Sequence, residues 1–186
     1  MGATGADRKM MHVWAGKLRF AALLLSLFAG LTASHAQLSS TDPDWKEADA
    51  PPAPVFDAAT LTRLVPFEVT IDSDLRWGID PSSIQISNDG LVRYVVVARS
   101  QSGVINAFYE TINCNKAEFK IHARHSGKGG WVLVERPDWR SMYDKAPSKH
   151  ALMLAKQGAC VGNSAAQNAT LMMHAIKNTG PSVYDR

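Results

Sequence analysis

The chain has 186 residues, enough for one domain with a buried core, and its formal net charge is +3. Four of the 20 basic residues and one of the 17 acidic residues lie in the first 36 positions, which leaves 16 of each sign in the remainder. This neutral remainder lacks the clustered basic excess by which proteins bind nucleic acid, so we expect no nucleic-acid partner.

Residues 1–36 have the pattern of a secretory signal peptide. A basic segment ends at Arg19, and the apolar segment 20–32 that follows is too short to span a membrane. Ser34 and Ala36 are small residues at the positions that a signal peptidase recognises before its cleavage site. We therefore expect cleavage after Ala36, a periplasmic location, and no stable membrane insertion of the mature chain.

Residues 37–54 are predicted to form an extended Pro-rich arm, because residues 51–54 read Pro-Pro-Ala-Pro. Trp45 is the one aromatic residue of this arm. We expect Trp45 to pack against the domain and fix the arm there, and the alternative is that it docks a partner.

The domain proper is predicted to begin at residue 55. Alternating apolar residues predict a half-buried strand over 66–71, and Pro66 favours a position at the sheet edge. Further apolar segments follow at 75–79 and 83–87. The Asn-Asp-Gly sequence at 88–90 is typical of a tight turn before the next strand.

Two apolar segments, 91–100 and 104–114, are joined by Gln-Ser-Gly, which is the pattern of a β-hairpin. Neither segment has a consistently polar face. A strand without a polar face is covered on both sides, so we expect this hairpin at the centre of the sheet.

The length of the hairpin turn decides which of its residues face each other. A two-residue turn places Arg93 opposite Glu110, whereas a three-residue turn places Arg93 opposite Thr111. Because an isolated buried charge is costly, we expect Arg93 and Glu110 each to lie near the other or near another charged partner.

Residues 117–125 are predicted to form a strand with one solvent-exposed face. The inward positions are Ala117, Phe119, Ile121 and Ala123, and the outward positions are Glu118, Lys120, His122 and Arg124. On such a strand His122 and His125 point to opposite faces and do not share a metal, and we expect no metal site. A further strand is predicted at 131–135.

The last third of the chain has helical periodicity. One helix is predicted from Pro147 to a stop at Gly158, and a second is predicted from a capping box at Ser164 and Gln167 to Gly180. The sequence thus predicts an α+β fold over residues 55–186. We expect an antiparallel meander of five or six strands with two C-terminal helices covering one face.

The chain has two cysteines, Cys114 and Cys160. In an exported protein an even number of cysteines favours a disulfide. The bond would join the end of the central hairpin to the end of the first predicted helix, and a loop of this length gives a stabilisation of about 4 kcal/mol in the chain-entropy model.

Several motifs along the chain carry a resemblance to a known family. They are Trp45-Lys46-Glu47, the Pro-rich segment, Asp80-Pro81, Ser83-Ile84, residues 89–94, Ser102-Gly103, Asn106, Tyr109-Glu110, Cys114, Trp131 and Cys160. Together they resemble the cryptic neisserial protein 1-like family of exported bacterial proteins over nearly all of the mature chain. The resemblance implies a location in the cell envelope and assigns no activity.

Four residues are candidates for ligand binding. Arg93, Tyr109 and Glu110 are polar or amphipathic groups on the apolar hairpin, and Arg124 lies on the predicted exposed face of the next strand. The alternative is a structural role, because a buried Arg–carboxylate pair commonly holds a fold together and is costly to break.

Two functions are consistent with the sequence. The first is a small periplasmic binding or accessory module that holds a ligand or an envelope protein, without a cofactor. The second is a hydrolase-like enzyme with a site near Glu110, Tyr109 and Arg124. We favour the module and assign no catalytic residue, because the common catalytic and phosphate-binding motifs are absent from the sequence. A cleft with a carboxylate of raised pKa would favour the enzyme.

Overall fold

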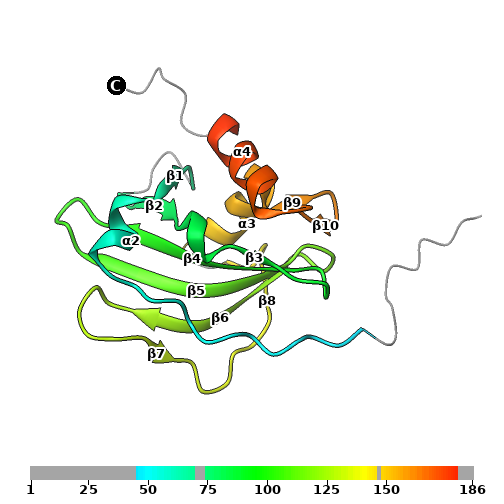
Figure 1. The fold of residues 1–186 in the computed structure, drawn as a ribbon, viewed down its shortest axis with the longest axis horizontal. Helices are drawn as coiled ribbons and strands as arrows, with labels where there is room; N and C mark the ends of the chain where they lie inside the picture. Colours follow the sequence, from blue (N-terminus) through cyan, green and yellow to red (C-terminus); the bar gives the residue numbers. More distant parts are fainter. Residues whose placement is uncertain (1–44, 70–73, 146–147, 180–186) are drawn as a thin grey trace, which may run out of the picture. The chain divides into compact units, whose positions relative to one another are not determined.

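The computed structural model describes residues 45–69, 74–145 and 148–179. These residues form a main antiparallel sheet with two C-terminal helical segments on one of its faces, and a separate two-stranded sheet in the C-terminal part (Figure 1). The predicted α+β class and the helical cover are therefore confirmed. None of the helices in these ranges is long and apolar enough to cross a membrane.

The sheet consists of a main path of six strands and two short additions. Along the path lie β1 (Val65–Phe67), β2 (Arg76–Ile79), β4 (Leu91–Arg99), β5 (Ile105–Asn113), β6 (Glu118–His125) and β7 (Val132–Leu133). The two-residue strands β3 (Gln85–Ile86) and β8 (Arg140–Ser141) pair with β4 and β6. β1 lies at one end of the order, as its proline predicts, and Ile71 of the predicted 66–71 strand lies outside the described residues.

The β4–β5 hairpin occupies the centre of the sheet, as predicted. Leu91 to Ala98 are all buried, because side chains from both faces are covered. We call the face of Val92, Tyr94 and Val96 the helix face, since the C-terminal helices pack on it. We call the face of Arg93, Val95 and Val97 the arm face.

The hairpin register places Arg93 opposite Thr111 and Tyr94 opposite Glu110. The turn is the three-residue one, Gln101-Ser102-Gly103, because the Ser100 amide donates to the Val104 carbonyl at 2.9 Å, and Gly103 supplies the positive φ of +83° that the turn requires. Arg93 and Glu110 consequently point to opposite faces. The direct pairing of Arg93 with Glu110 is therefore wrong, and the second of the two predicted registers is the one observed.

A β-bulge in β6 changes which of its residues share a face. Tyr109 pairs with Ala123 whereas Glu110 pairs with Ile121, so His122 is the additional residue. Phe119 packs into the core on the helix face, but Ala123 packs with Tyr109 on the arm face. The prediction that these residues share one inward face is wrong, because an extra residue inverts the alternation.

The same bulge corrects two further expectations for β6. The strand has no exposed face, since Lys120 and His125 are buried. His122 and His125 both lie on the arm face, where His122 Nε2 is 2.6 Å from Thr111 Oγ1 and the His125 ring is 4.7 Å from the Phe56 ring. Even so, no group of three or more metal-binding side chains occurs within the described ranges.

The helical cover begins with α3 (His150–Leu154), which continues as a π-helical turn over Ala155–Ala159. The predicted stop at Gly158 is confirmed. This glycine has a φ of +155°, and a Cβ there would lie 2.8 Å from the carbonyl oxygen of Met172. Glycine therefore allows the turn to pass close to α4 (Ala169–Thr179).

The start of α4 differs from the predicted capping box. Ser164 lies in β10 (Ser164–Ala165), which pairs with β9 (Cys160–Val161). Asn168 provides the cap instead, because its Oδ1 accepts a hydrogen bond of 2.9 Å from the Leu171 amide. The predicted helix end at Gly180 and helix start at Pro147 lie outside the described residues.

The predicted disulfide is present. Cys114, directly after β5, is bonded to Cys160 with a Cα–Cα distance of 5.7 Å. It ties the end of the central hairpin to the end of the π-helical turn. The sheet and its helical cover are thus covalently connected.

The N-terminal arm, residues 45–54, covers the arm face together with α2 (Ala58–Thr62), and is drawn in cyan in Figure 1. The Trp45 indole donates a 2.8 Å hydrogen bond to the Asp89 carbonyl. The Glu47 carboxylate lies 2.6 Å from Lys120 Nζ, and the Trp131 indole donates to the Pro54 carbonyl at 2.6 Å. Trp45 therefore packs against the domain, as expected.

Candidate functional site

The four residues predicted to bind a ligand do not come together. Arg93 and Tyr109 lie on the arm face, whereas Glu110 and Arg124 lie on the helix face. The two pairs are therefore on opposite sides of the sheet. The sheet thus divides the predicted site into two separate groups, which we consider in turn.

Arg93 is 2% exposed and is held by the turn before β4 and by the arm. Its guanidinium contacts Asp89 at 3.1 Å, donates to the Ala48 carbonyl at 2.9 Å and donates to the Ser87 hydroxyl. Burial of Asp89 raises its pKa, but hydrogen bonds from Ser87 and Arg93 outweigh burial and hold that pKa below its usual range. With its charge compensated, Arg93 acts here as an anchor for the arm.

Other polar groups on the arm face are also inaccessible to a ligand. The Tyr109 hydroxyl is buried without a hydrogen-bond partner, and burial raises its pKa despite the nearby charge of Arg93. Burial, with a smaller effect of Lys120, lowers the pKa of His122. Lys120 is neutralised by Glu47 and lies over the Trp139 ring, 4.3 Å from its centroid. The arm occupies the position from which a ligand would reach these groups.

Glu110 forms a buried polar cluster on the helix face. It is 0% exposed and accepts a 3.0 Å hydrogen bond from the Tyr94 hydroxyl, while His150 Nε2 lies 2.9 Å from its Oε1. His150 stacks on Trp77 with a centroid distance of 4.6 Å, and its Nδ1 lies 2.9 Å from the Ser148 hydroxyl. Burial and the charge of Glu110 raise the pKa of Tyr94 well above its usual value.

Ser148, His150 and Glu110 are the residue types of a hydrolase catalytic triad. A triad must be open to its substrate, and this cluster is not. Glu110 and His150 are buried, and neither lines any of four cavities formed by the described residues. The Ser148 hydroxyl accepts the His150 amide at 3.2 Å, which is a local contact at the start of α3. The arrangement therefore serves to join α3 to the sheet.

Arg124 is exposed on the helix face. Its guanidinium carbon lies 5.8 Å from the centroid of the Phe108 ring, and it forms no ion pair with a described carboxylate. No cavity adjoins it among the four just mentioned. Arg124 is thus a single surface charge, separate from Glu110.

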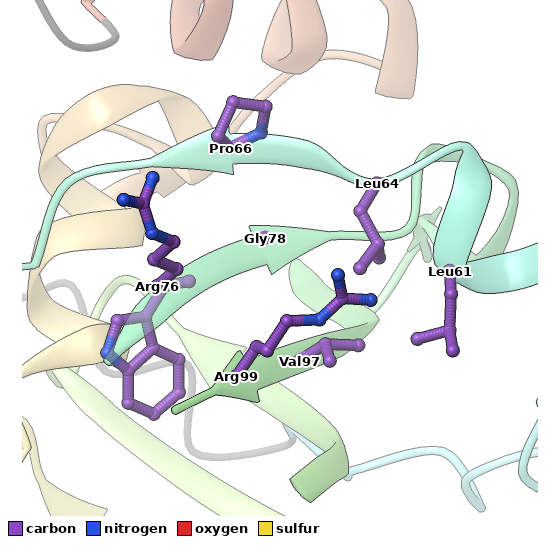
Figure 2. Close-up of a pocket in the computed structure, with 8 residues that line it drawn as sticks. Leu61, Leu64, Pro66, Arg76, Gly78, Val97 and Arg99 are labelled. Carbon is purple, nitrogen blue, oxygen red and sulfur yellow. The ribbon is translucent and has the colours of Figure 1, made fainter. Parts of the chain in front are cut away.

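An open pocket lies on the arm face beside α2, where the arm does not cover the sheet. Its apolar wall comes from α2, from the residues around β1 and from β4, and its volume is about 170 Å³. Figure 2 labels five of the wall residues, Leu61, Leu64, Pro66, Gly78 and Val97, and Trp77 also lines the pocket. Arg76 and Arg99 rise from β2 and β4 beside it (Figure 2).

Arg76 and Arg99 face each other directly in the β2–β4 register. Like charges in this position destabilise a sheet. Both side chains are exposed, and neither forms an ion pair with a described carboxylate. Asp74, two residues before Arg76, accepts a hydrogen bond from Gln101 at 3.3 Å, and Glu68 follows β1 without an ion pair. Among the described residues, no carboxylate compensates the two guanidinium groups, so they are available to an anion.

Sequence reasoning missed this pair because the two arginines are 23 positions apart. Arg76 is the first residue of β2 and Arg99 is the last of β4, so only the strand register brings them together. The one available signal was that each arginine lies at the end of a mostly apolar strand. That signal does not specify which strands are neighbours.

A larger cavity, of about 550 Å³, lies between the π-helical turn and α4. It is lined by the single cation Lys156 and by Gln157, whose buried Oε1 has no hydrogen-bond partner. Gln157 is held in place by a 2.6 Å hydrogen bond from its Nε2 to the Glu68 carbonyl. This cavity has one cation in its lining, whereas the Arg76–Arg99 pocket has two arginines that form no ion pair with a described carboxylate.

Comparison with known proteins returns one finding. The model of the CNP1-like family matches residues 40–177, which is most of the chain and includes both cysteines and the Arg76–Arg99 pocket. No curated protein and no solved structure matches the chain.

Proposed function

The chain belongs to the CNP1-like family, and from this we propose that it is a small exported accessory module of the bacterial envelope that binds a ligand between Arg76 and Arg99. The family match agrees with the resemblance found in the sequence. The family match does not indicate an activity. The proposed function therefore depends on the geometry of the candidate site.

Two features support export. The first 36 residues have the basic, apolar and small-residue segments of a signal peptide. The Cys114–Cys160 disulfide is a bond that persists in oxidising compartments such as the periplasm and is rare in the cytosol.

Export predicts a definite mature chain. Protein recovered from the periplasm is expected to have the intact mass of residues 37–186 with two hydrogens fewer, because of the disulfide. Intact-mass spectrometry measures this directly. A soluble product that retains residues 1–36 would contradict the proposal.

The observation that carries the binding function is a pair of arginines without an ion pair to any described carboxylate, beside an open apolar pocket. Two like charges placed opposite each other cost stability unless an anion joins them. The apolar wall of the pocket in turn favours a ligand with an apolar part. The full burial of Glu110 supports the module over the alternative hydrolase, since substrate and water must reach a catalytic carboxylate.

The proposal predicts that envelope material stabilises the parent protein through this pocket. An envelope extract is expected to raise the melting temperature of the parent but not that of the double variant Arg76→Gln, Arg99→Gln. The charge-matched control is Arg136→Gln, since Arg136 is exposed and forms no ion pair with a described carboxylate. The control should respond like the parent. An equal shift in the parent and the double variant would show that binding occurs elsewhere.

A further inference from the structure

We propose that the ligand of the Arg76–Arg99 pocket is a carboxylate joined to a small apolar group. This inference rests on the proposed function and specifies the chemistry of the same site. It follows from three properties of the pocket: the geometry of its charges, the nature of its wall and its size.

The charges select an anion. Arg76 and Arg99 are direct cross-strand neighbours, and residues so placed have Cβ atoms about 5 Å apart. In Figure 2 the Arg76 guanidinium points toward β1 and the Arg99 guanidinium points toward Leu64. Because both side chains are exposed and based this close, rotation about their side-chain bonds brings both guanidinium groups within reach of one anionic group. A guanidinium is planar and pairs with a carboxylate through two parallel N–H donors, so one carboxylate can accept from both arginines.

The wall selects an apolar ligand and disfavours a strongly hydrated anion. The side chains of Leu61, Leu64 and Val97 supply apolar surface, and Gly78 leaves the sheet surface between them bare. A Cβ at Gly78 would lie 3.1 Å from the Leu64 Cβ, so glycine is what allows Leu64 to approach the sheet here. A monoanion loses less hydration beside such a wall than a phosphate dianion does.

The volume suits a small apolar group. The pocket is open to solvent, and its volume of about 170 Å³ is close to that of an enclosed cavity that holds one benzene molecule. Hexanoate, whose pentyl group is of about this size, is therefore a suitable probe. The same chemistry occurs in a free short-chain acid and at the carboxyl terminus of a peptide that ends in an apolar residue.

Titration of the full-length protein with hexanoate, followed by NMR of the Gly78 and Val97 amides, tests the assignment. Hexanoate is expected to shift both amides in a saturable manner. Hexanamide, which lacks the charge, and acetate, which lacks the apolar part, should each bind at least tenfold more weakly. Inorganic phosphate at the same concentration should not displace hexanoate.

Variants assign the charge recognition to the two arginines. Arg76→Gln and Arg99→Gln should each weaken hexanoate binding at least tenfold, whereas Arg136→Gln should leave it unchanged. Both pocket variants should melt at or above the temperature of the parent, because each removes a like-charge contact. The melting temperatures therefore show whether a variant fails to bind because it is unfolded or because it lacks the arginine.

A dipeptide, N-acetyl-alanyl-leucine, distinguishes the two sources of the carboxylate. If the dipeptide binds more tightly than hexanoate, the ligand is the carboxyl terminus of a peptide. If hexanoate binds more tightly, the ligand is a free short-chain acid. Equal binding of hexanoate and hexanamide, or an equal effect of Arg136→Gln and Arg76→Gln, would overturn the inference. If hexanoate fails while envelope extract still stabilises only proteins with the intact pocket, the ligand class is wrong and the binding function remains.

Discussion

Replacing Glu110 by alanine is expected to lower the free energy of unfolding by about 3–5 kcal/mol, because two buried polar groups lose their hydrogen-bond acceptor at a cost of about 1–3 kcal/mol each. The substitution leaves the buried Nε2 of His150 and the Tyr94 hydroxyl without their acceptor, in a region that water does not reach. For a domain of this size the melting temperature should fall by roughly 10–20 °C. Thermal and chemical denaturation measure the two quantities.

The partners of Glu110 provide the controls. His150→Ala should be destabilising to a similar degree, and the double variant should cost less than the sum of the single variants, because the two residues share one interaction. Arg124→Ala, an exposed charge on the same face, should change stability by less than about 0.5 kcal/mol. If Glu110→Ala melts like the parent, the cluster does not connect α3 to the sheet.

Removing the disulfide is the second change with a large expected effect. In the double variant Cys114→Ala, Cys160→Ala the loss of a cross-link over 46 positions should lower the free energy of unfolding by about 4 kcal/mol. The bond joins β5 to the π-helical turn, so its loss frees the helical cover in the unfolded chain. Chemical denaturation of the variant and the parent gives the difference.

A reducing agent distinguishes the effect of losing the disulfide from the effect of replacing the cysteine side chains. Reduction should destabilise the parent and leave the alanine variant unchanged, since only the parent has a disulfide to lose. Thiol labelling of the parent, unfolded without a reductant, should find no free cysteine. Two labelled thiols per chain would contradict the assignment.

The parts of the fold that sequence predicted are those set by local pattern. The β4–β5 hairpin was predictable because its strands lack a polar face, and a chain segment of that kind is stable only when covered on both sides. The stop at Gly158 was predictable because a positive φ excludes most other residues. The disulfide followed from the number of cysteines and the expected compartment.

The parts that sequence did not predict depend on single-residue differences in register. The bulge at His122 inverts the faces of β6, and nothing in the alternation of residues 117–125 announces an extra residue. The three-residue turn, which the sequence left open beside a two-residue one, likewise separates Arg93 from Glu110. A shift of one position moves a side chain to the other face of the sheet, so turn length and the bulge together divide the predicted site.

The open site was beyond sequence reasoning for a different reason. Arg76 and Arg99 are ordinary terminal residues of their strands, and each taken alone reads as a solvated surface charge. Their relation exists only through the pairing of β2 with β4, which joins segments separated by β3 in the chain. Long-range pairing of this kind is what periodicity does not encode.

The arm has a consequence for the order in which the molecule assembles. Its anchors are far away in the chain: Glu47 meets Lys120 and Trp139 at separations of 73 and 92 positions, and Pro54 meets Trp131 at 77. Contacts of such high contact order close large loops and form slowly compared with a hairpin. The arm therefore docks after the sheet that receives it, although it precedes that sheet in the chain. A fluorophore attached ahead of Trp45 would consequently report on the final stage of folding.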